Sequence, residues 1–451
     1  MKHFTIRQFM DACRGTWYGP PELLNHPIQG VVVDSRLAEK DFVFVATAGE
    51  RVDGHRFIPA AFEKGAVCAV SRQKLDEPAG PYLLVEEPLQ ALKDGAEAYR
   101  KTLRIPVVGI TGSVGKTSTK EMIATVLEQK YRVLKTPGNF NNEIGVPLTI
   151  FQIDTHHEAA VLEMGMNHFG EMHRLSRIVR PTHCVFTNIG VAHLEHLGSR
   201  EGILKAKLEM LDYAAKDASL FVNGDDDLLT ALKDRAVTFG RSASSQVWAD
   251  QVENLGLDGI RCTIHAQGQE MDVTIPLPGV HMVYNACAGV SLGLSLGLCM
   301  EEIRRGIEAL RPLSGRSRIL HTGAYTLIDD CYNANPVSMC AMLEVLDHAS
   351  TRKVAILGDM GELGKNSEAL HASVGEKIRS LRTDVVVTIG PLSEALHRAA
   401  SSCAALCLHY DTVEDFLEDS AHVLKNGDSI LVKASHYMKF EQIIAALSVQ
   451  A

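Results

Sequence analysis

A buried strand that runs into a glycine-containing turn and then a helix constrains this chain more than any other segment. Residues 106–119 read Pro-Val-Val-Gly-Ile-Thr-Gly-Ser-Val-Gly-Lys-Thr-Ser-Thr, and a helical pattern follows through Glu128. Such a turn points backbone N–H groups at an anion, and the helix N-terminus adds partial positive charge. Strand, turn and helix together predict a phosphate-binding loop for a nucleoside triphosphate.

The predicted loop is a short form of the general pattern. That pattern requires glycine, four residues, then Gly-Lys-[Ser/Thr], but Ile110 stands where the first glycine belongs. A chance glycine-rich turn is the alternative, and the flanking strand and helix argue against it. We expect Lys116 to reach the outer phosphates and the Thr117 hydroxyl to hold Mg²⁺. The residues predicted to bind the nucleotide here are Gly112, Ser113, Gly115, Lys116, Thr117 and Ser118.

Length, charge and cysteine usage narrow the class of protein. At 451 residues the chain should form about three domains. A formal net charge of −10 without a long basic run argues against a nucleic-acid partner. No secretory segment is evident, and the apolar stretch 286–300 is too short and glycine-interrupted to span a bilayer. Ten cysteines without a Cys-x-x-Cys pair predict reduced thiols. We therefore expect a soluble, cytoplasmic protein, and a monomer.

The hydrophobic pattern predicts an α/β fold with three domains. Residues 1–103 combine short strands and helices in a small α/β domain. Residues 104–312 carry the loop, and their strands are apolar throughout, as in a parallel sheet that is covered on both faces. From residue 313 to 451 strands and helices alternate again, which predicts a C-terminal Rossmann-like domain.

Polar residues cluster directly after the predicted central strands. The segment 136–149 contains Asn139, Asn141 and Asn142, which supply amide donors and acceptors for a ligand, or else form a surface turn. Glu163 ends a buried strand and is placed either to hold Mg²⁺ or simply to be solvated. His193 follows the next strand and could ligate a metal or orient phosphate. His193 and His196 resemble a zinc-binding pair only superficially, because no Cys or third His stands at ligand spacing.

The order of these motifs resembles the Mur ligase family, the ATP-dependent amide-forming enzymes of bacterial cell-wall precursor synthesis. Further matches lie in Asn285-Ala, Gly315-Arg316 and the runs 329–336 (Asp-Asp-Cys-Tyr-Asn-Ala-Asn-Pro) and 357–364 (Leu-Gly-Asp-Met-Gly-Glu-Leu-Gly). The last two runs resemble the member that adds D-Ala-D-Ala to UDP-MurNAc-tripeptide. The Asp-Asn-Pro-Arg motif typical of the enzyme adding the third amino acid is absent. The leading domain, with Asp34-Ser-Arg and 49–55, resembles the family's UDP-binding domain.

The resemblance implies roles for particular residues. ATP and Mg²⁺ would be the cofactors, with Thr117, Glu163 and His193 as metal ligands. The implied catalytic residues are Lys116, His193 and Lys207. Lys207 would be the helix lysine that family members commonly carbamylate. On the sequence pattern alone, however, Lys205 and Lys207 are ordinary solvated lysines. The contacts implied to the nucleotide are Asn285, Arg316 and Asp330. Those implied to UDP-MurNAc-tripeptide are Ser35, Arg36, Asn141 and Asn142. Asn333 and Asn335 would lie near D-Ala-D-Ala.

One departure and three alternatives remain. The family often shows Lys-Gly-Ser-Arg near the C-terminus, whereas residues 433–436 read Lys-Ala-Ser-His. Folylpolyglutamate synthase shares the loop and general layout but would not need the leading domain. A GTPase would need an Asn-Lys-x-Asp motif, which is absent. A non-catalytic nucleotide-binding protein would have weakened metal ligands, but Thr117, Glu163 and His193 all stand.

Overall fold

The computed structural model describes residues 1, 3–49, 52–402 and 404–449. Their contacts group into two compact units, each built from several stretches of the chain. The first unit comprises Met1–Thr111, Lys130–Val185 and Ala206–Leu220, and the second comprises Gly112–Gln129, Phe186–Lys205 and Phe221–Ala451. The predicted domain divisions after residues 103 and 312 stay predictions.

The leading segment forms a five-stranded sheet in the order β1-β5-β4-β3-β2. Strands β2 to β5 are parallel to their neighbours, and β1 pairs antiparallel with β5. One apolar core lies between the sheet and α2 and includes Phe44, Ala61 and Tyr82. The elements are α1 (Ile6–Cys13), β1 (Thr16–Tyr18), β2 (Gly30–Val32), β3 (Phe42–Val45), α2 (Ile58–Glu63), β4 (Cys68–Ser71), β5 (Tyr82–Leu84) and α3 (Pro88–Thr102).

A nine-stranded sheet follows, in the order β14-β13-β12-β11-β10-β9-β6-β8-β7. Its strands are β6 (Val107–Thr111), β7 (Val133–Lys135), β8 (Ala159–Glu163), β9 (His183–Phe186), β10 (Ser219–Asn223), β11 (Val237–Gly240), β12 (Val247–Asn254), β13 (Ile260–Ala266) and β14 (Gln269–Ile275). Its helices are α4 (Lys116–Leu127), α5 (Gly145–Phe151), α6 (Glu171–Val179), α7 (Leu194–Leu197), α8 (Arg200–Leu208), α9 (Met282–Ser295) and α10 (Met300–Glu308).

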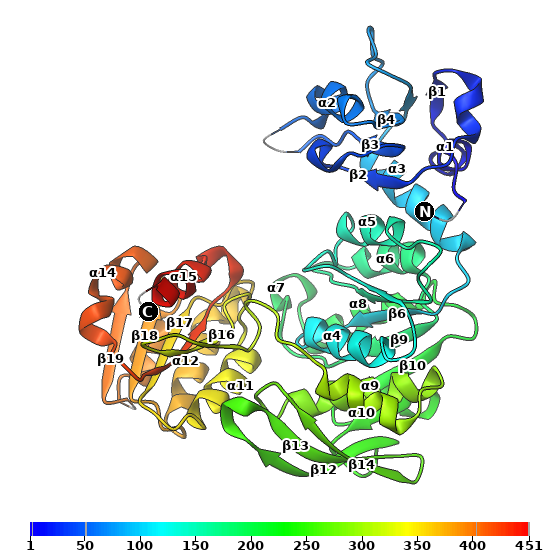
Figure 1. Cartoon of the computed structure of the whole chain (residues 1–451). Coiled ribbons are helices and arrows are strands. Elements are labelled where there is room, and N and C mark those ends of the chain that lie inside the picture. The colour runs from blue at the N-terminus through cyan, green and yellow to red at the C-terminus, as the bar shows by residue number, and fades with distance from the viewer. Residues whose placement is uncertain (2, 50–51, 403, 450–451) are drawn as a thin grey trace. The chain divides into compact units, whose positions relative to one another are not determined.

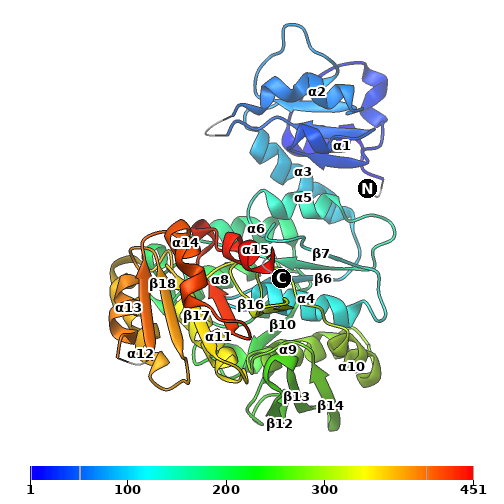
Figure 2. The same cartoon turned by 60° about the vertical axis from the view of Figure 1, so that its left-hand side comes forward.

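The central sheet has the predicted parallel strands and, at one edge, antiparallel strands that the sequence pattern did not reveal. Strands β12, β13 and β14 pair antiparallel, and α9 and α10 pack against them (Figure 2). The turn between β13 and β14 consists of Gln267 and Gly268, which both have positive φ. Two left-handed residues form the tight turn that matches strand twist in a hairpin. The alternating burial of β14 fits a sheet with one solvated face, a pattern that parallel strands lack.

The C-terminal segment forms a six-stranded sheet in the order β15-β16-β20-β17-β18-β19. It is parallel except for β15, an edge strand that the sequence pattern did not reveal. Its elements are β15 (Arg318–His321), β16 (Thr326–Asp329), α11 (Pro336–Asp347), β17 (Lys353–Gly358), α12 (Ser367–Ile378), β18 (Val385–Ile389), α13 (Glu394–Ala400), β19 (Leu406–Tyr410), α14 (Val413–Val423), β20 (Ser429–Lys433) and α15 (Glu441–Val449).

Helices cover both faces of this C-terminal sheet (Figure 1). One apolar core joins the strands to α14 and α15 through residues such as Phe416 and Ile443. A second core joins the other face to α11, α12 and α13 through residues such as Leu343 and Leu396. Two covered faces explain why β17, β18 and β20 are buried along their whole length.

Two further expectations concern helices and thiols. Among the described residues, no helix is long and apolar enough to cross a membrane. The nine cysteines in the described part of the chain are free thiols, as the sequence predicted.

Candidate active site

The phosphate-binding loop leaves β6 and enters α4 through two glycines that the geometry requires. A Cβ atom at Gly112 would overlap the Thr187 hydroxyl, so the close approach needs glycine. Gly115 has φ +78° and occupies the N-cap of α4. The ammonium of Lys116 donates to the Gly112 carbonyl at 2.9 Å. The loop therefore has the turn, the open helix N-terminus and the lysine that phosphate binding needs.

The segment after β9 holds this loop in place. The Val114 N–H donates to Oδ1 of Asn188 at 3.0 Å, and Nδ2 of Asn188 donates back to the Val114 carbonyl at 3.0 Å. The Thr187 hydroxyl donates to the same carbonyl at 2.7 Å, and the Gly190 N–H donates to Oγ of Ser113 at 2.9 Å. Sequence reasoning missed Asn188 as a residue that shapes the loop. Its place directly after a strand was the available signal.

Asn285, the predicted adenine contact, lies on α9 beside the helix that follows the loop. Its Oδ1 accepts from the Thr119 hydroxyl at 2.8 Å, and its Nδ2 donates to Sδ of Met282 at 3.3 Å. The side chain is buried, so these bonds fix its orientation. The tertiary structure thus joins α9 to α4, which lie far apart in the sequence.

Glu163 ends β8, the strand next to β6. Ile110 of β6 pairs with Glu163 in the parallel register, and only Thr111 separates Ile110 from the start of the phosphate-binding loop in the chain. The Glu163 side chain is 2% exposed. The Thr136 hydroxyl accepts from the Glu163 N–H at 2.9 Å, and Nδ2 of Asn141 donates to Oε1 of Glu163 at 2.8 Å. Glu163 is therefore a buried, oriented carboxylate, not the solvated strand end that the sequence left open.

The asparagines of the segment 136–149 have different environments. Asn141 contacts Glu163, whereas Oδ1 of Asn142 accepts from the N–H groups of Ile144 and Gly145 at 3.1 and 2.8 Å. Asn142 thereby supports the start of α5. Asn139 has an exposed side chain. The neighbouring amides of Asn141 and Asn142 therefore have different hydrogen-bond partners within this loop.

His193 has a left-handed backbone with φ +62° and precedes α7. Its Nδ1 lies 2.6 Å from Oε2 of Glu362, which also has a left-handed backbone with φ +61°. Non-glycine residues in this region are uncommon and concentrate at functional sites. The second unit therefore brings the His193 segment together with the loop after β17, which contains residues 359–364 of the run 357–364.

Lys205 and Lys207 lie on α8 in opposite environments. Lys205 is exposed, whereas Lys207 is only 1% exposed. Lysine is almost never fully buried without a partner. The burial favours Lys207 over Lys205 as the residue with a special role.

The run 329–336 is anchored by a buried lysine. The ammonium of Lys433 pairs with Oδ2 of Asp330 and donates to the Asn333 carbonyl at 2.8 Å. Oδ1 of Asp330 accepts from the Ser317 N–H at 2.8 Å. In the sequence Lys433 stands out only as part of a divergent motif, because its partner Asp330 lies 103 residues away.

Arg316 and His436 both contact the ring of Tyr332. The guanidinium carbon of Arg316 lies 4.1 Å from the ring centroid, within cation–π range. The His436 ring is stacked against Tyr332 with centroids 5.3 Å apart. Where the family often has arginine, this chain therefore uses His436 as an aromatic neighbour of Tyr332.

The side chain of Asn335 caps a helix, whereas the side chain of Asn333 is exposed. Asn333 is exposed, and its Oδ1 accepts from the N–H of the neighbouring Ala334 at 2.8 Å. Asn335 is the N-cap of α11: its Oδ1 accepts from the Ser338 N–H at 2.9 Å, and its own N–H donates to Oγ of Ser338 at 3.1 Å. This reciprocal cap gives Asn335 a structural task.

A substitution separates the structural role of Asn335 from a substrate contact. We expect Asn335→Ala to lower the free energy of unfolding by about 1 kcal/mol, because α11 loses its cap. Urea unfolding measures this change, and Asn335→Asp, which keeps a capping acceptor, is the matched control. A raised KM for the incoming amine substrate with unchanged stability would contradict the structural role.

In the leading domain, Ser35 and Arg36 lie on a short turn capped by Asp34. The guanidinium of Arg36, 85% exposed, pairs with the Asp34 carboxylate at 2.7 Å and lowers the pKa of that carboxyl. Ser35 is buried. In the other predicted run, 49–55, Nδ1 of His55 lies 2.6 Å from Asp53. Glu50 and Arg51 of that run lie outside the described residues.

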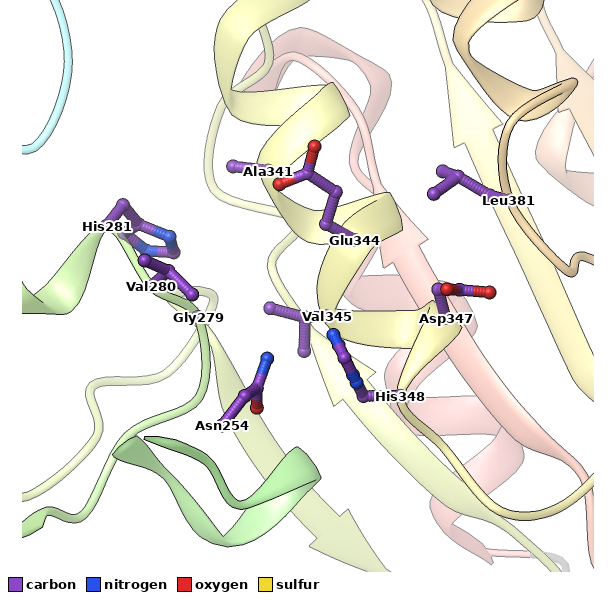
Figure 3. Close-up of a pocket in the computed structure, with 10 residues that line it drawn as sticks. All are labelled: Asn254, Gly279, Val280, His281, Ala341, Glu344, Val345, Asp347, His348 and Leu381. Carbon is purple, nitrogen blue, oxygen red and sulfur yellow. The ribbon is translucent and has the colours of Figure 1, made fainter. Parts of the chain in front are cut away.

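A small cavity of about 170 Å³ is present within the second unit (Figure 3). Gly279, Val280 and His281 line one side, and the end of α11 lines the other. Its carboxylates already face cations: Glu344 pairs with Lys377 at 2.8 Å, and Asp347 with Arg382 at 3.4 Å. None of the residues predicted to bind substrates or cofactors lines it, so it is distinct from the predicted site.

The phosphate-binding loop, the buried strand-end carboxylate and the flanking α/β sheets define a nucleotide-dependent enzyme of the phosphate-loop class. Three family models match consecutive stretches: "Mur ligase family, catalytic domain" over 27–109, "Mur ligase middle domain" over 110–293, and "Mur ligase, glutamate ligase domain" over 315–436. The chain belongs to the Mur ligase family.

Curated relatives match over nearly the full length of both chains. The UDP-N-acetylmuramoyl-tripeptide–D-alanyl-D-alanine ligase of Bacillus subtilis is 37% identical, covering 98% of each chain. The Escherichia coli protein of the same name is 33% identical, again covering 98% of each chain. These identities extend across all three sheets, including the leading one.

Solved structures give the same relationship. MurF from Acinetobacter baumannii superposes with a TM-score of 0.90 at 31% identity, covering 99% of each chain. MurF ligase from Thermotoga maritima, solved in complex with ADP, gives 0.82 at 29% identity, covering 93% of this chain and 97% of that one. Folylpolyglutamate synthase from Mycobacterium tuberculosis shares the fold, with a TM-score of 0.61 at 17% identity, covering 79% of this chain and 94% of that one.

Proposed function

We propose that this chain is an ATP-dependent ligase that joins D-Ala-D-Ala to UDP-MurNAc-tripeptide in peptidoglycan precursor synthesis. The observation that carries this proposal is the match to relatives of that one activity over 98% of both chains. The ADP complex of the Thermotoga maritima relative supports use of ATP. The folylpolyglutamate synthase alternative rests on fold alone, and its likeness covers 79% of this chain.

The reaction has two chemical steps. The terminal carboxylate of the tripeptide attacks the γ-phosphorus of ATP, which forms an acyl phosphate and releases ADP. The amine of D-Ala-D-Ala then attacks the acyl carbon and displaces phosphate, forming the amide bond. The first step brings two anions together, so the site must supply fixed positive charge and exclude water.

The nucleotide-binding residues follow from this requirement. The loop residues Gly112, Ser113 and Gly115 and the first turn of α4, with Ser118, would bind the phosphates. Lys116 would supply the fixed cation, and its ammonium donates to the Gly112 carbonyl of the loop at 2.9 Å. Asn285 would contact adenine, and Arg316 and Asp330 would contact the phosphates and ribose.

Mg²⁺ fits the predicted donor set. Thr117 and Glu163 provide hard oxygen ligands on buried side chains, and His193 is proposed as a further ligand. In the described part of the chain, no three His, Cys, Asp or Glu side chains form a metal cage of their own. This agrees with an ion that takes one or two protein carboxylates together with substrate phosphates. When bound, the ion neutralises charge that develops on the transferred phosphoryl group.

Lys207 is proposed as the carbamylated lysine of the family. Carbamylation converts the ammonium into an anionic, carboxylate-like group, whose charge a bound divalent cation would offset. The burial of Lys207 and the exposure of Lys205 on the same helix support this choice.

The remaining assignments concern substrates and location. Ser35 and Arg36 would contact the nucleotide end of UDP-MurNAc-tripeptide, and Asn142 another part of this substrate. Asn333, which is exposed, is a better candidate for D-Ala-D-Ala than Asn335, whose side chain caps α11. We also propose that the enzyme works in the cytoplasm, where ATP is available, and as a monomer.

The requirement for both substrates tests the function directly. We expect phosphate release from ATP only when UDP-MurNAc-tripeptide and D-Ala-D-Ala are present together, because the acyl phosphate needs an amine acceptor to turn over. A coupled phosphate assay with each substrate omitted in turn measures this. Turnover with a folate and glutamate in their place would make the chain a folylpolyglutamate synthase instead.

A further inference from the structure

The asparagine loop and the strand-end carboxylate meet at one edge of the central sheet, within the first unit. Strands β7 and β8 are parallel neighbours, with Lys135 paired to Val161, so both end at the same edge. The Thr136 N–H extends the pairing by donating to the Val161 carbonyl at 3.0 Å. The loop that begins at Thr136 is therefore anchored beside Glu163 before it reaches Asn141.

Both the backbone and the side chain of Asn141 are fixed against the segment after β8. The Gly165 N–H donates to the Asn141 carbonyl at 2.9 Å, and the Asn141 amide donates to Glu163 at 2.8 Å. A Cβ atom at Gly165 would lie 3.0 Å from the Asn141 side chain, tighter than ordinary packing, so glycine admits this approach. The chain on the C-terminal side is held as well, because Glu143 pairs with Arg174 at 2.6 Å and Lys93 at 3.2 Å.

We propose that Asn141 is a positioning residue for Glu163, and that it acts on the metal-binding carboxylate rather than as a substrate contact. The inference rests on the proposed function only in taking Glu163 as a ligand of the divalent cation. The amide donor on Oε1 restricts rotation of the carboxylate plane, which presents the group in one orientation. Because an amide is neutral, it orients the carboxylate without competing with a cation for its charge.

Divalent-cation binding in the absence of the UDP substrate tests this role. Mn²⁺, observed by electron paramagnetic resonance with the full-length enzyme and ADP, is the probe. We expect Asn141→Leu and Asn141→Ala each to raise the Kd of Mn²⁺ about tenfold, the loss typical for removal of a group that orients a metal ligand. Asn139→Leu, on the same loop with an exposed side chain, is the matched control and should leave the Mn²⁺ Kd unchanged.

The double variant Asn141→Leu/Glu163→Gln makes the test specific. If Asn141 acts through Glu163, the double variant should bind Mn²⁺ no more weakly than Glu163→Gln alone. Thermal unfolding of each variant checks that the loop change leaves the fold intact, and the Asn141→Ala result stands where leucine does not fit.

Two distinguishable results would contradict the role proposed for Asn141 or the role proposed for Glu163. An unchanged Mn²⁺ Kd in both Asn141 variants, with a raised KM for UDP-MurNAc-tripeptide, would make Asn141 a substrate contact and end this inference. An unchanged Mn²⁺ Kd in Glu163→Gln would instead remove Glu163 from the metal site, which is a failure of the proposed function.

Discussion

Replacing Lys116 by alanine is expected to lower kcat by roughly 10²–10³-fold or more, because the transferred phosphoryl group loses its fixed cation. The lysine stands at the start of α4, where its ammonium is 2.9 Å from the Gly112 carbonyl. Steady-state phosphate release with saturating substrates measures the change. Near-normal turnover would contradict the assignment of the loop to catalysis.

Two further variants separate charge from structure at this position. Lys116→Met keeps most of the side-chain length and should be as inactive as Lys116→Ala, because both lack the charge. Lys116→Arg keeps a cation but presents a planar, five-donor fork, so we expect only partial recovery. The thermal midpoint of each variant identifies any loss that comes from a disordered loop.

Replacing Lys207 by alanine is expected to abolish ligation, with kcat lowered by at least 10²-fold, whereas Lys205→Ala should retain most of it. The two lysines lie on the same helix, but only Lys207 is buried. A buried, carbamylated lysine contributes an anion to the site that alanine cannot replace. Phosphate release under identical conditions compares the two variants directly.

A chemical measurement accompanies this comparison. Incubation of the wild-type enzyme with ¹³C-bicarbonate should give a carbamate ¹³C resonance that is absent from Lys207→Ala and present in Lys205→Ala. Equal activity of the two variants would show that burial of Lys207 serves only packing. A resonance that persists in Lys207→Ala would place the carbamate on another lysine.

Much of the secondary structure could be predicted from local patterns. Strands β18 and β20, at residues 385–389 and 429–433, contain short continuous apolar runs, a pattern typical of strands that are covered on both faces. The hairpin of β13 and β14 was missed, because its turn is Gln267-Gly268 rather than a common Asn-Gly pair. β15 was missed because its four residues carry no distinctive pattern.

Residue roles were harder to predict than residue positions. Asn335 was expected near the incoming dipeptide, and the structure gives it a helix cap with Ser338. Asn188 and Lys433 received no role, although each fixes a segment of the predicted site. Local sequence shows which residues can donate or accept, but not which partner they meet.

The sequence by itself determined the phosphate-binding loop, since strand, Gly112, Gly115 and Lys116 are contiguous and their stereochemistry is local. It also carried the motifs that resemble the Mur ligase family. Only the tertiary structure decided that Asn141 contacts Glu163, 22 residues away, and that Asn188 clamps the loop 74 residues before it. The physical reason is that such contacts depend on which strand ends share a sheet edge, and strand order is set by packing of the whole sheet.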